Sequence, residues 1–237
     1  MAGHSKWANI KHRKERADQK KGKLFSQLTK ELITAVKMGG ADVKTNAKLR
    51  AILEKAKKAG LSKETIERNI KKASQLGGEG YAEVIYELYG YGGVGILAVA
   101  LTDNKNRTAS LMRIATNKKG GSIAAPGSVS YNFDQKGVIQ VAKDLMEEDA
   151  LFLMASEAGA EDFASVEEGY MIITPPQDLY AMKDQLDELQ IPSDASLEFI
   201  PKAVVACNEE DAKLNHELIQ FLEETEDVDV VYHNMDL

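Results

Sequence analysis

The feature that most constrains this chain of 237 residues is a basic segment near its start that cannot fold by itself. Between Lys11 and Lys23 there is no large apolar side chain, and only Glu15 and Asp18 are acidic. A segment of this composition buries too little apolar surface to offset the entropy lost on ordering. It therefore needs a partner, and seven Lys and Arg residues within these thirteen positions indicate that the partner is an anion.

The basic segment belongs to a strong charge asymmetry along the chain. Residues 1–75 hold 20 Lys and Arg against 7 Asp and Glu, a balance of +13. Residues 76–130 hold 5 against 4, and residues 131–237 hold 5 against 26, a balance of −21. The overall charge of −7 therefore conceals a basic head, residues 1–75, followed by an acidic body.

Apolar residues recur at three- and four-residue spacing through the head, which predicts helices behind the basic arm. Ser62 is a good N-cap for the third of them, and Gly60 is a good C′ residue for the second. The three helices are expected at about 24–39, 44–59 and 62–73.

After a linker at 75–80 the pattern changes to short strands. A helix is expected after the second strand, with Asp103 or Asn104 as its N-cap. Strands are expected at about 84–88, 94–101, 129–133, 203–206 and 228–232, with another helix at 209–222.

Residues 137–200 show the order β-α-β-β-α-β, which is typical of the ferredoxin-like fold. The strands after Pro201 could not bury their faces alone, so we infer that they complete the sheet begun at 82–133. The predicted fold is α+β, with an all-helical N-terminal domain followed by two α+β (ferredoxin-like) domains, one inserted in the other. The predicted domains are 1–75 (arm plus helices), 81–134 with 201–237, and 135–200.

Motifs that carry catalysis or bind a metal are missing from the sequence. There is one cysteine, Cys207, and the four histidines are too scattered to form a metal cluster. No phosphate-loop, HExxH or GxSxG pattern occurs. We therefore expect a protein that is not an enzyme and needs neither cofactor nor metal. The longest apolar stretch, Val94 to Leu101, is too short to span a bilayer, so no membrane partner and a cytoplasmic location are expected.

Several stretches resemble one family over essentially the whole chain. They are MAGHSKWANIKHRK at the start, TDNKNRT at 102–108, Gly120-Gly121 with Gly127-Ser128-Val129, and Val231 to Asn234. On these motifs the chain is similar to the YebC/PmpR family. The resemblance implies the three-domain arrangement above. It implies a DNA-binding transcriptional regulator, because the family carries that label. The family also includes a mitochondrial translational activator, which implies an alternative: a ribosome- or rRNA-associated translation factor that helps synthesis of proline-rich sequences.

The expected partner is thus nucleic acid, either DNA or ribosomal RNA, or the ribosome itself. Lys outnumbers Arg by 16 to 4 in residues 1–75, which favours contact with phosphates over reading of bases. Only Asn46 with Arg50, and Arg68 with Asn69, approach a base-reading face. The residues expected to bind nucleic acid are Lys6, Trp7, Lys11, His12, Arg13, Lys14, Arg16, Lys20, Lys21, Lys23, Lys48, Arg50, Lys55 and Lys58.

Two of these expectations have structural alternatives. Trp7 can stack on a base, or it can pin the arm to its own domain. Lys48, Lys55 and Lys58 are expected on the outer side of the second helix, where they can also serve solubility alone. A secondary anion site is expected at a helix start, where the alternative is a simple N-cap; it consists of Asn104, Lys105, Arg107 and Thr108.

Overall fold

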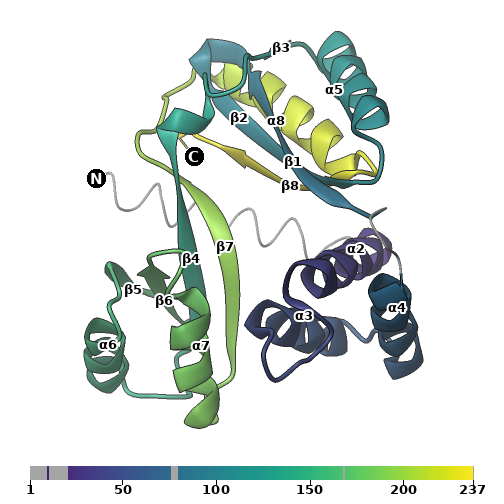
Figure 1. Cartoon of the computed structure of the whole chain (residues 1–237). Coiled ribbons are helices and arrows are strands. Elements are labelled where there is room, and N and C mark those ends of the chain that lie inside the picture. The colour runs from purple at the N-terminus through teal and green to yellow at the C-terminus, as the bar shows by residue number, and fades with distance from the viewer. Residues whose placement is uncertain (1–9, 11–20, 76–79, 168, 237) are drawn as a thin grey trace. The chain divides into compact units, whose positions relative to one another are not determined.

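The computed structural model describes residues 10, 21–75, 80–167 and 169–236, and the side chains of 21, 22 and 75 are not described. The chain forms two compact units, one made of residues 1–134 and 201–237 and the other of residues 135–200 (Figure 1). The finer division into three domains stays a prediction.

Residues 21–75 of the head form three helices, as its periodicity predicts. Leu32 of α2, Leu49 of α3 and Ile66 of α4 meet in one apolar core, and Leu32 and Leu49 are fully buried. Ser62 Oγ accepts a hydrogen bond from the amide of Thr65 and so caps α4. The helices are α2 (Lys21–Gly39), α3 (Ala47–Lys58) and α4 (Lys63–Gln75).

The first unit also holds a four-stranded antiparallel sheet in the order β3-β1-β2-β8. Its apolar face packs against two helices, because Met112 of α5 and Leu218 of α8 share one core with Ile96 of β2. The strands are β1 (Ala82–Tyr89), β2 (Gly95–Thr102), β3 (Ser122–Ile123) and β8 (Val228–His233), and the helices are α5 (Lys105–Lys119) and α8 (Glu209–Glu224).

The second unit has the strand order β5-β6-β4-β7, which is the order of a ferredoxin-like sheet. Both of its helices cover one face, where Leu151 of α6 and Leu179 of α7 pack on Ile139 and Ile172. The α+β prediction for this segment is confirmed. The elements are β4 (Phe133–Ala142), α6 (Glu148–Glu157), β5 (Asp162–Val166), β6 (Gly169–Thr174), α7 (Leu179–Glu188) and β7 (Ser193–Pro201).

The strand predicted at 129–133 is wrong: a 3-10 turn, η2 (Ser130–Asn132), precedes β4 there. The cause is a carboxylate. Glu87 of β1 accepts hydrogen bonds from the amides of Gly127, Val129 and Ser130 at 2.6, 2.6 and 2.8 Å. These amides are the donors that a strand ladder would have used, so the segment curls around the carboxylate instead.

The strand predicted at 203–206 is also wrong. Only one bridge forms there, between Val205 and Met235, with the amide of Val205 donating to the carbonyl of Asn234 at 2.7 Å. Asn208 already caps α8 three residues later, where its side chain accepts from the amide of Asp211. The chain has no room for a longer strand before it turns into the helix.

A substitution of Glu87 by Gln tests how far this carboxylate holds the loop at 124–130. Burial alone would raise the pKa of Glu87, but hydrogen bonds from Gly127, Ser130 and Val129 lower it below the ordinary value. We expect Glu87→Gln to cost about 2 kcal/mol of unfolding free energy, because hydrogen bonds to a charged acceptor are lost. The exposed Glu83 on the same strand is the matched control, and Glu83→Gln should cost nothing in the same urea titration. Equal losses for the two variants would contradict the assignment.

Candidate nucleic-acid interface

Most of the arm residues predicted to bind nucleic acid lie outside the described part of the chain. The interface is therefore built from α2, α3 and α4, whose side chains are described from Lys23 onward. The predictions that fall outside are Lys6, Trp7, Lys11, His12, Arg13, Lys14, Arg16 and Lys20, together with the side chain of Lys21.

Lys23 binds a helix end inside the protein. Its Nζ donates to the carbonyl oxygens of Glu223 and, at 3.0 Å, Thr225, where α8 ends. A cation placed at the carboxyl end of a helix satisfies its last carbonyls and complements the helix dipole. Its ammonium group is therefore engaged within the protein.

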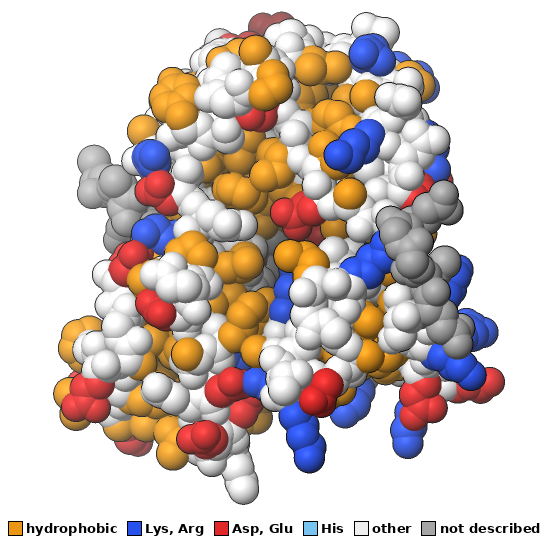
Figure 2. Space-filling model, viewed as in Figure 1, with side chains coloured by type: hydrophobic (Ala, Val, Ile, Leu, Met, Phe, Trp, Pro, Cys, Tyr) orange, Lys and Arg blue, Asp and Glu red, His pale blue; other side chains and the backbone are white. Residues whose placement is uncertain are grey.

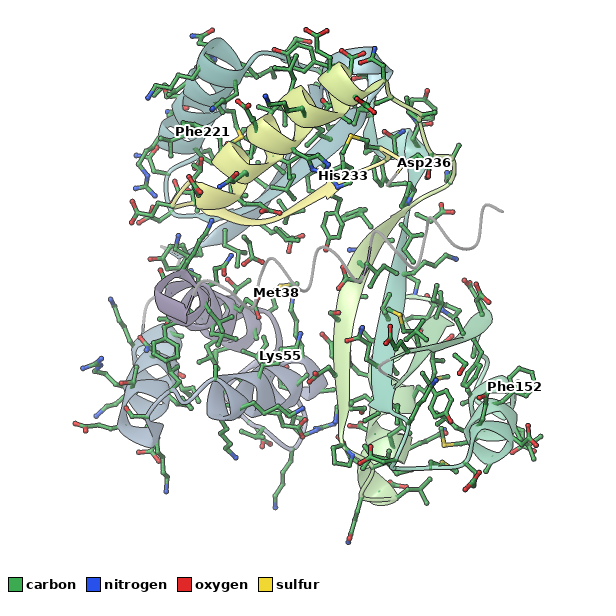
Figure 3. All side chains as sticks on the ribbon, turned by 180° about the vertical axis from the view of Figure 1, so that it is seen from behind. Met38, Lys55, Phe152, Phe221, His233 and Asp236 are labelled. Atoms are coloured by element: carbon green, nitrogen blue, oxygen red, sulfur yellow. The ribbon has the colours of Figure 1, made fainter. Side chains whose placement is uncertain are left out.

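The predicted cations of α3 divide into an outer and an inner group. Lys58 is exposed, as expected, whereas Lys48 and Lys55 are half-buried; Figure 3 labels Lys55. Both inner lysines act on the carboxylate of Glu31 on α2, and Lys55 also acts on Asp229 of β8. The charges of Lys48 and Lys55 thus act on acids of the chain itself. Of the three lysines predicted on the outer side of α3, Lys58 alone is exposed.

Of the two residue pairs that approached a base-reading face, three residues are engaged within the head and Arg68 is exposed. Arg50 donates from Nη1 to the carbonyls of Val43 and Lys44 at 3.0 and 2.9 Å. Asn46 is buried, caps α3 by accepting from the amide of Leu49, and donates to the carbonyl of Ala35. Asn69 donates to the carbonyl of Thr65 on its own helix.

Apart from Lys44, which precedes α3, the exposed cations of the head lie on the end of α3 and along α4, where Figure 2 shows Lys and Arg side chains projecting outward. Three exposed acids, Asp42, Glu64 and Glu67, accompany them. The pair Lys63–Glu67 at 3.8 Å is so exposed that it contributes little to stability. The exposed cations among the described head residues are Lys44, Lys57, Lys58, Lys63, Arg68, Lys71 and Lys72.

The predicted secondary anion site surrounds a carboxylate of the protein itself. Asn104 caps α5 by accepting from the amide of Arg107 at 3.0 Å. The guanidinium of Arg107 donates two hydrogen bonds to the carboxylate of Asp227, from Nε to Oδ2 at 2.9 Å and from Nη2 to Oδ1 at 2.7 Å. Thr108 donates to Asp227 at 2.9 Å, while Lys105 is exposed. The four residues are thus brought together, but three of them already serve the cap and the internal carboxylate.

The electrostatics of this cluster match that geometry. Burial alone would raise the pKa of Asp227, but hydrogen bonds from Arg107 and Thr108 and the charge of Lys30 lower it below the ordinary value. The bond to Asp227 and the one to Asp103 raise the pKa of Arg107. Asp227 lies 120 residues from Arg107 in sequence, and nothing in the local pattern identifies it as the partner.

A second pair of acids, Glu31 of α2 and Asp229 of β8, has the opposite behaviour. Burial, and then the charge of Glu31, raise the pKa of Asp229 to about 7. Burial also raises the pKa of Glu31, against the lowering effect of Lys55 and Lys48. The backbone carbonyl of Asp229 accepts a hydrogen bond from Gln27 of α2 at 2.5 Å.

Two other classes of site were sought in the same residues. No group of three or more His, Cys, Asp or Glu side chains in the described ranges could hold a metal ion. None of the helices that the structure describes combines the length and the apolar character needed to cross a membrane.

Comparisons with known proteins cover nearly the full chain. Family models described as "TACO1/YebC protein N-terminal domain" and "TACO1/YebC second and third domain" match residues 5–76 and 81–235. A protein of Protochlamydia amoebophila named "probable transcriptional regulatory protein" is 56% identical over 236 residues, covering 99% of this chain and 96% of the relative. One of Chlamydia pneumoniae with the same designation is 55% identical over 237 residues, covering 99% and 100%.

A solved structure shares the fold. The crystal structure of a conserved hypothetical protein from Aquifex aeolicus superposes with a TM-score of 0.81 at 43% sequence identity. The match covers 90% of this chain and 89% of that chain.

A substitution of Asp227 by Asn tests the buried ion pair. We expect Asp227→Asn to cost about 3 kcal/mol or more of unfolding free energy, because Arg107 and Lys30 lose the charge that compensates them. Asp103 provides a matched control, since it binds the same guanidinium at 2.8 Å with its side chain 55% exposed. Asp103→Asn should cost less than about 1 kcal/mol. Urea unfolding of both variants is the measurement. A smaller loss of unfolding free energy for Asp227→Asn than for Asp103→Asn would refute the assignment.

A substitution of Asp229 by Asn tests the raised pKa. The folded protein holds a proton on Asp229 up to about pH 7, whereas the unfolded chain releases it near the ordinary value of 3.8. The stability that this group contributes is therefore present at low pH and lost as the pH rises toward 7. We expect Asp229→Asn to stabilise the protein, and by more at pH 8 than at pH 5. Urea unfolding at both pH values is the check, and an equal effect at the two would contradict the raised pKa.

Proposed function

The chain belongs to the TACO1/YebC family, and from this premise we propose that it is a nucleic-acid-binding regulator of gene expression whose basic head holds phosphates. Relatives more than half identical over essentially the full chain are named probable transcriptional regulatory proteins. Duplex DNA is therefore the first partner we propose. The contacting residues proposed are the basic arm and the exposed cations of α3 and α4.

The observation that carries the proposal is the uncompensated charge of the head. Residues 1–75 have a balance of +13, while the whole chain has −7. Among the described residues of the head there are seven exposed cations and three exposed acids. A surface of this kind repels itself unless an anion is bound, and a phosphate backbone is the anion with matching extent.

The chemistry of these cations favours positioning on the backbone over reading of sequence. Six of the seven exposed head cations are Lys, whose ammonium is a point charge without the planar fork that reads guanine. Such contacts fix a protein on nucleic acid and carry no sequence information directly. Affinity should therefore depend steeply on salt.

The second candidate is a translation factor bound to ribosomal RNA. Backbone contacts by Lys favour it, because folded RNA presents phosphates in the same way and its deep major groove is closed to side chains. Under this alternative the head would hold rRNA, and the protein would help the ribosome make proline-rich sequences. An enzymatic function has no support from named relatives or from a catalytic constellation in the sequence.

A pair of substitutions in the head tests the proposal. Wild-type protein should bind duplex DNA with a log–log salt slope of roughly −5 if about six phosphates are contacted. Lys57→Gln with Lys58→Gln should weaken binding to all duplex sequences alike and reduce the slope by about 2. A fluorescence anisotropy titration at several salt concentrations measures both quantities.

The matched control removes the same charge elsewhere. Lys143 and Lys213 are exposed lysines outside the head, and Lys143→Gln with Lys213→Gln should leave the slope unchanged. If both pairs of substitutions change the salt slope equally, α3 does not contact the phosphates as proposed. The same titration with a structured rRNA fragment separates the two candidates. Binding to RNA alone, together with co-sedimentation with ribosomes at moderate salt, would favour the translation factor over the DNA-binding regulator.

A further inference from the structure

Helix α5 carries a second concentration of positive charge, outside the head. Ten Lys and Arg residues follow residue 75, and five of them fall within the fifteen residues of α5. The helix contains no Asp or Glu. Its inner side is buried through Thr108, Met112 and Ala115, so its outer side is fixed by packing.

The outer side of α5 forms one polar stripe. Asn106, Ser110, Arg113 and Asn117 are all exposed, and their spacing of four, three and four residues is that of neighbours on one helix face. At about 100° per residue they fall within about 60° of one another and extend about 16 Å along the axis. Residues of the same types in the head, Asn46, Arg50 and Asn69, have structural roles instead.

The side chains of this stripe are available to a ligand. Within the described part of the chain, the amides of Asn106 and Asn117 and the guanidinium of Arg113 make no hydrogen bond or ion pair. Ser110 donates to the carbonyl of Asn106 at 3.0 Å and keeps its acceptor lone pairs. Three members of the stripe, Asn106, Arg113 and Asn117, therefore offer planar polar groups without internal partners among these residues.

Lysines flank the stripe on both sides. Lys105 and Lys118 are exposed and lie roughly 110° to either side of it. Lys118 Nζ lies 5.6 Å from the ring centroid of Phe221 on α8 (labelled in Figure 3), and Lys119 binds Glu217 of α8 at 3.2 Å. The two lysines at the end of α5 thus contact α8, where Lys119 compensates the charge of Glu217.

We propose that α5 lies in the major groove of duplex DNA and reads bases with Arg113, Asn106 and Asn117. Arg pairs with the O6 and N7 atoms of guanine and Asn with the N6 and N7 atoms of adenine, and the groove admits one α-helix. Lys105 and Lys118 contact the phosphates on its two sides. Duplex RNA fits this stripe poorly, because its major groove is deep and narrow. The inference rests on the proposed function and adds sequence preference to it.

Selection from a duplex library with a random 20-base-pair core, using the full chain at 150 mM salt, tests the inference. Wild-type protein should enrich one motif containing a guanine. Arg113→Lys keeps the charge and removes the fork. It should reduce discrimination at that guanine about 5- to 150-fold while changing the salt slope by less than 1. Asn117→Ala should relax an adenine position in the same way.

The outcomes separate this inference from the proposed function. Salt-dependent binding without any enriched motif overturns the role of α5 and leaves the phosphate-binding head intact. A motif that both variants enrich as strongly as the wild type also overturns it. Arg68→Gln, which removes an exposed guanidinium from the head, is the control, and it should lower affinity for every sequence without changing the motif. Failure to bind any duplex DNA would refute both the DNA-binding function and the base-reading role of α5. Binding to RNA alone would support the translation factor instead.

Discussion

A carboxylate buried between the end of α8 and the start of β8 has to be neutralised from within the protein, and much of the first unit is arranged to do so. Asp227 is 1% exposed, and an unpaired charge at that depth would be prohibitive. Arg107 from α5 and Lys30 from α2 reach it, at 2.7 and 3.5 Å. The carboxylate of Asp227 thus connects α2 of the head, α5, and the start of β8.

The positive charge of the head consequently has two uses. Lys23 and Lys30 bind groups near the α8–β8 connection, and the charges of Lys48 and Lys55 lower the pKa of Glu31 against the effect of burial. A count of basic residues overstates the charge offered to a ligand, because such inner cations are already balanced. The exposed cations at the end of α3 and on α4 outnumber the exposed acids of α4, which makes geometry more informative than composition about where phosphates would bind.

Sequence reasoning succeeded where the determining interactions are local. The caps at Ser62 and Asn104 and the left-handed glycine at Gly60 (φ +86°) follow from contacts within a few residues. It failed at 129–133, where alternation predicts a strand but Glu87, about forty residues away, binds the amides. The partner of Arg107 is equally distant. The polar stripe of α5 was readable from its spacing, but it becomes a candidate only once the opposite side is known to be buried.

The discontinuous path of the chain imposes an order on folding during synthesis. All of the second unit, residues 135–200, leaves the ribosome as one continuous stretch and can close its sheet early. The sheet of the first unit cannot form completely at that stage, because β2 pairs with β8, which is made last. The paired residues Ile96 and His233 are more than one hundred positions apart. Until then one edge of β2 stays open, and α2 lacks the acceptors near residue 227. The basic head therefore leaves the ribosome first and stays without these acceptors while the phosphates of ribosomal RNA are close by.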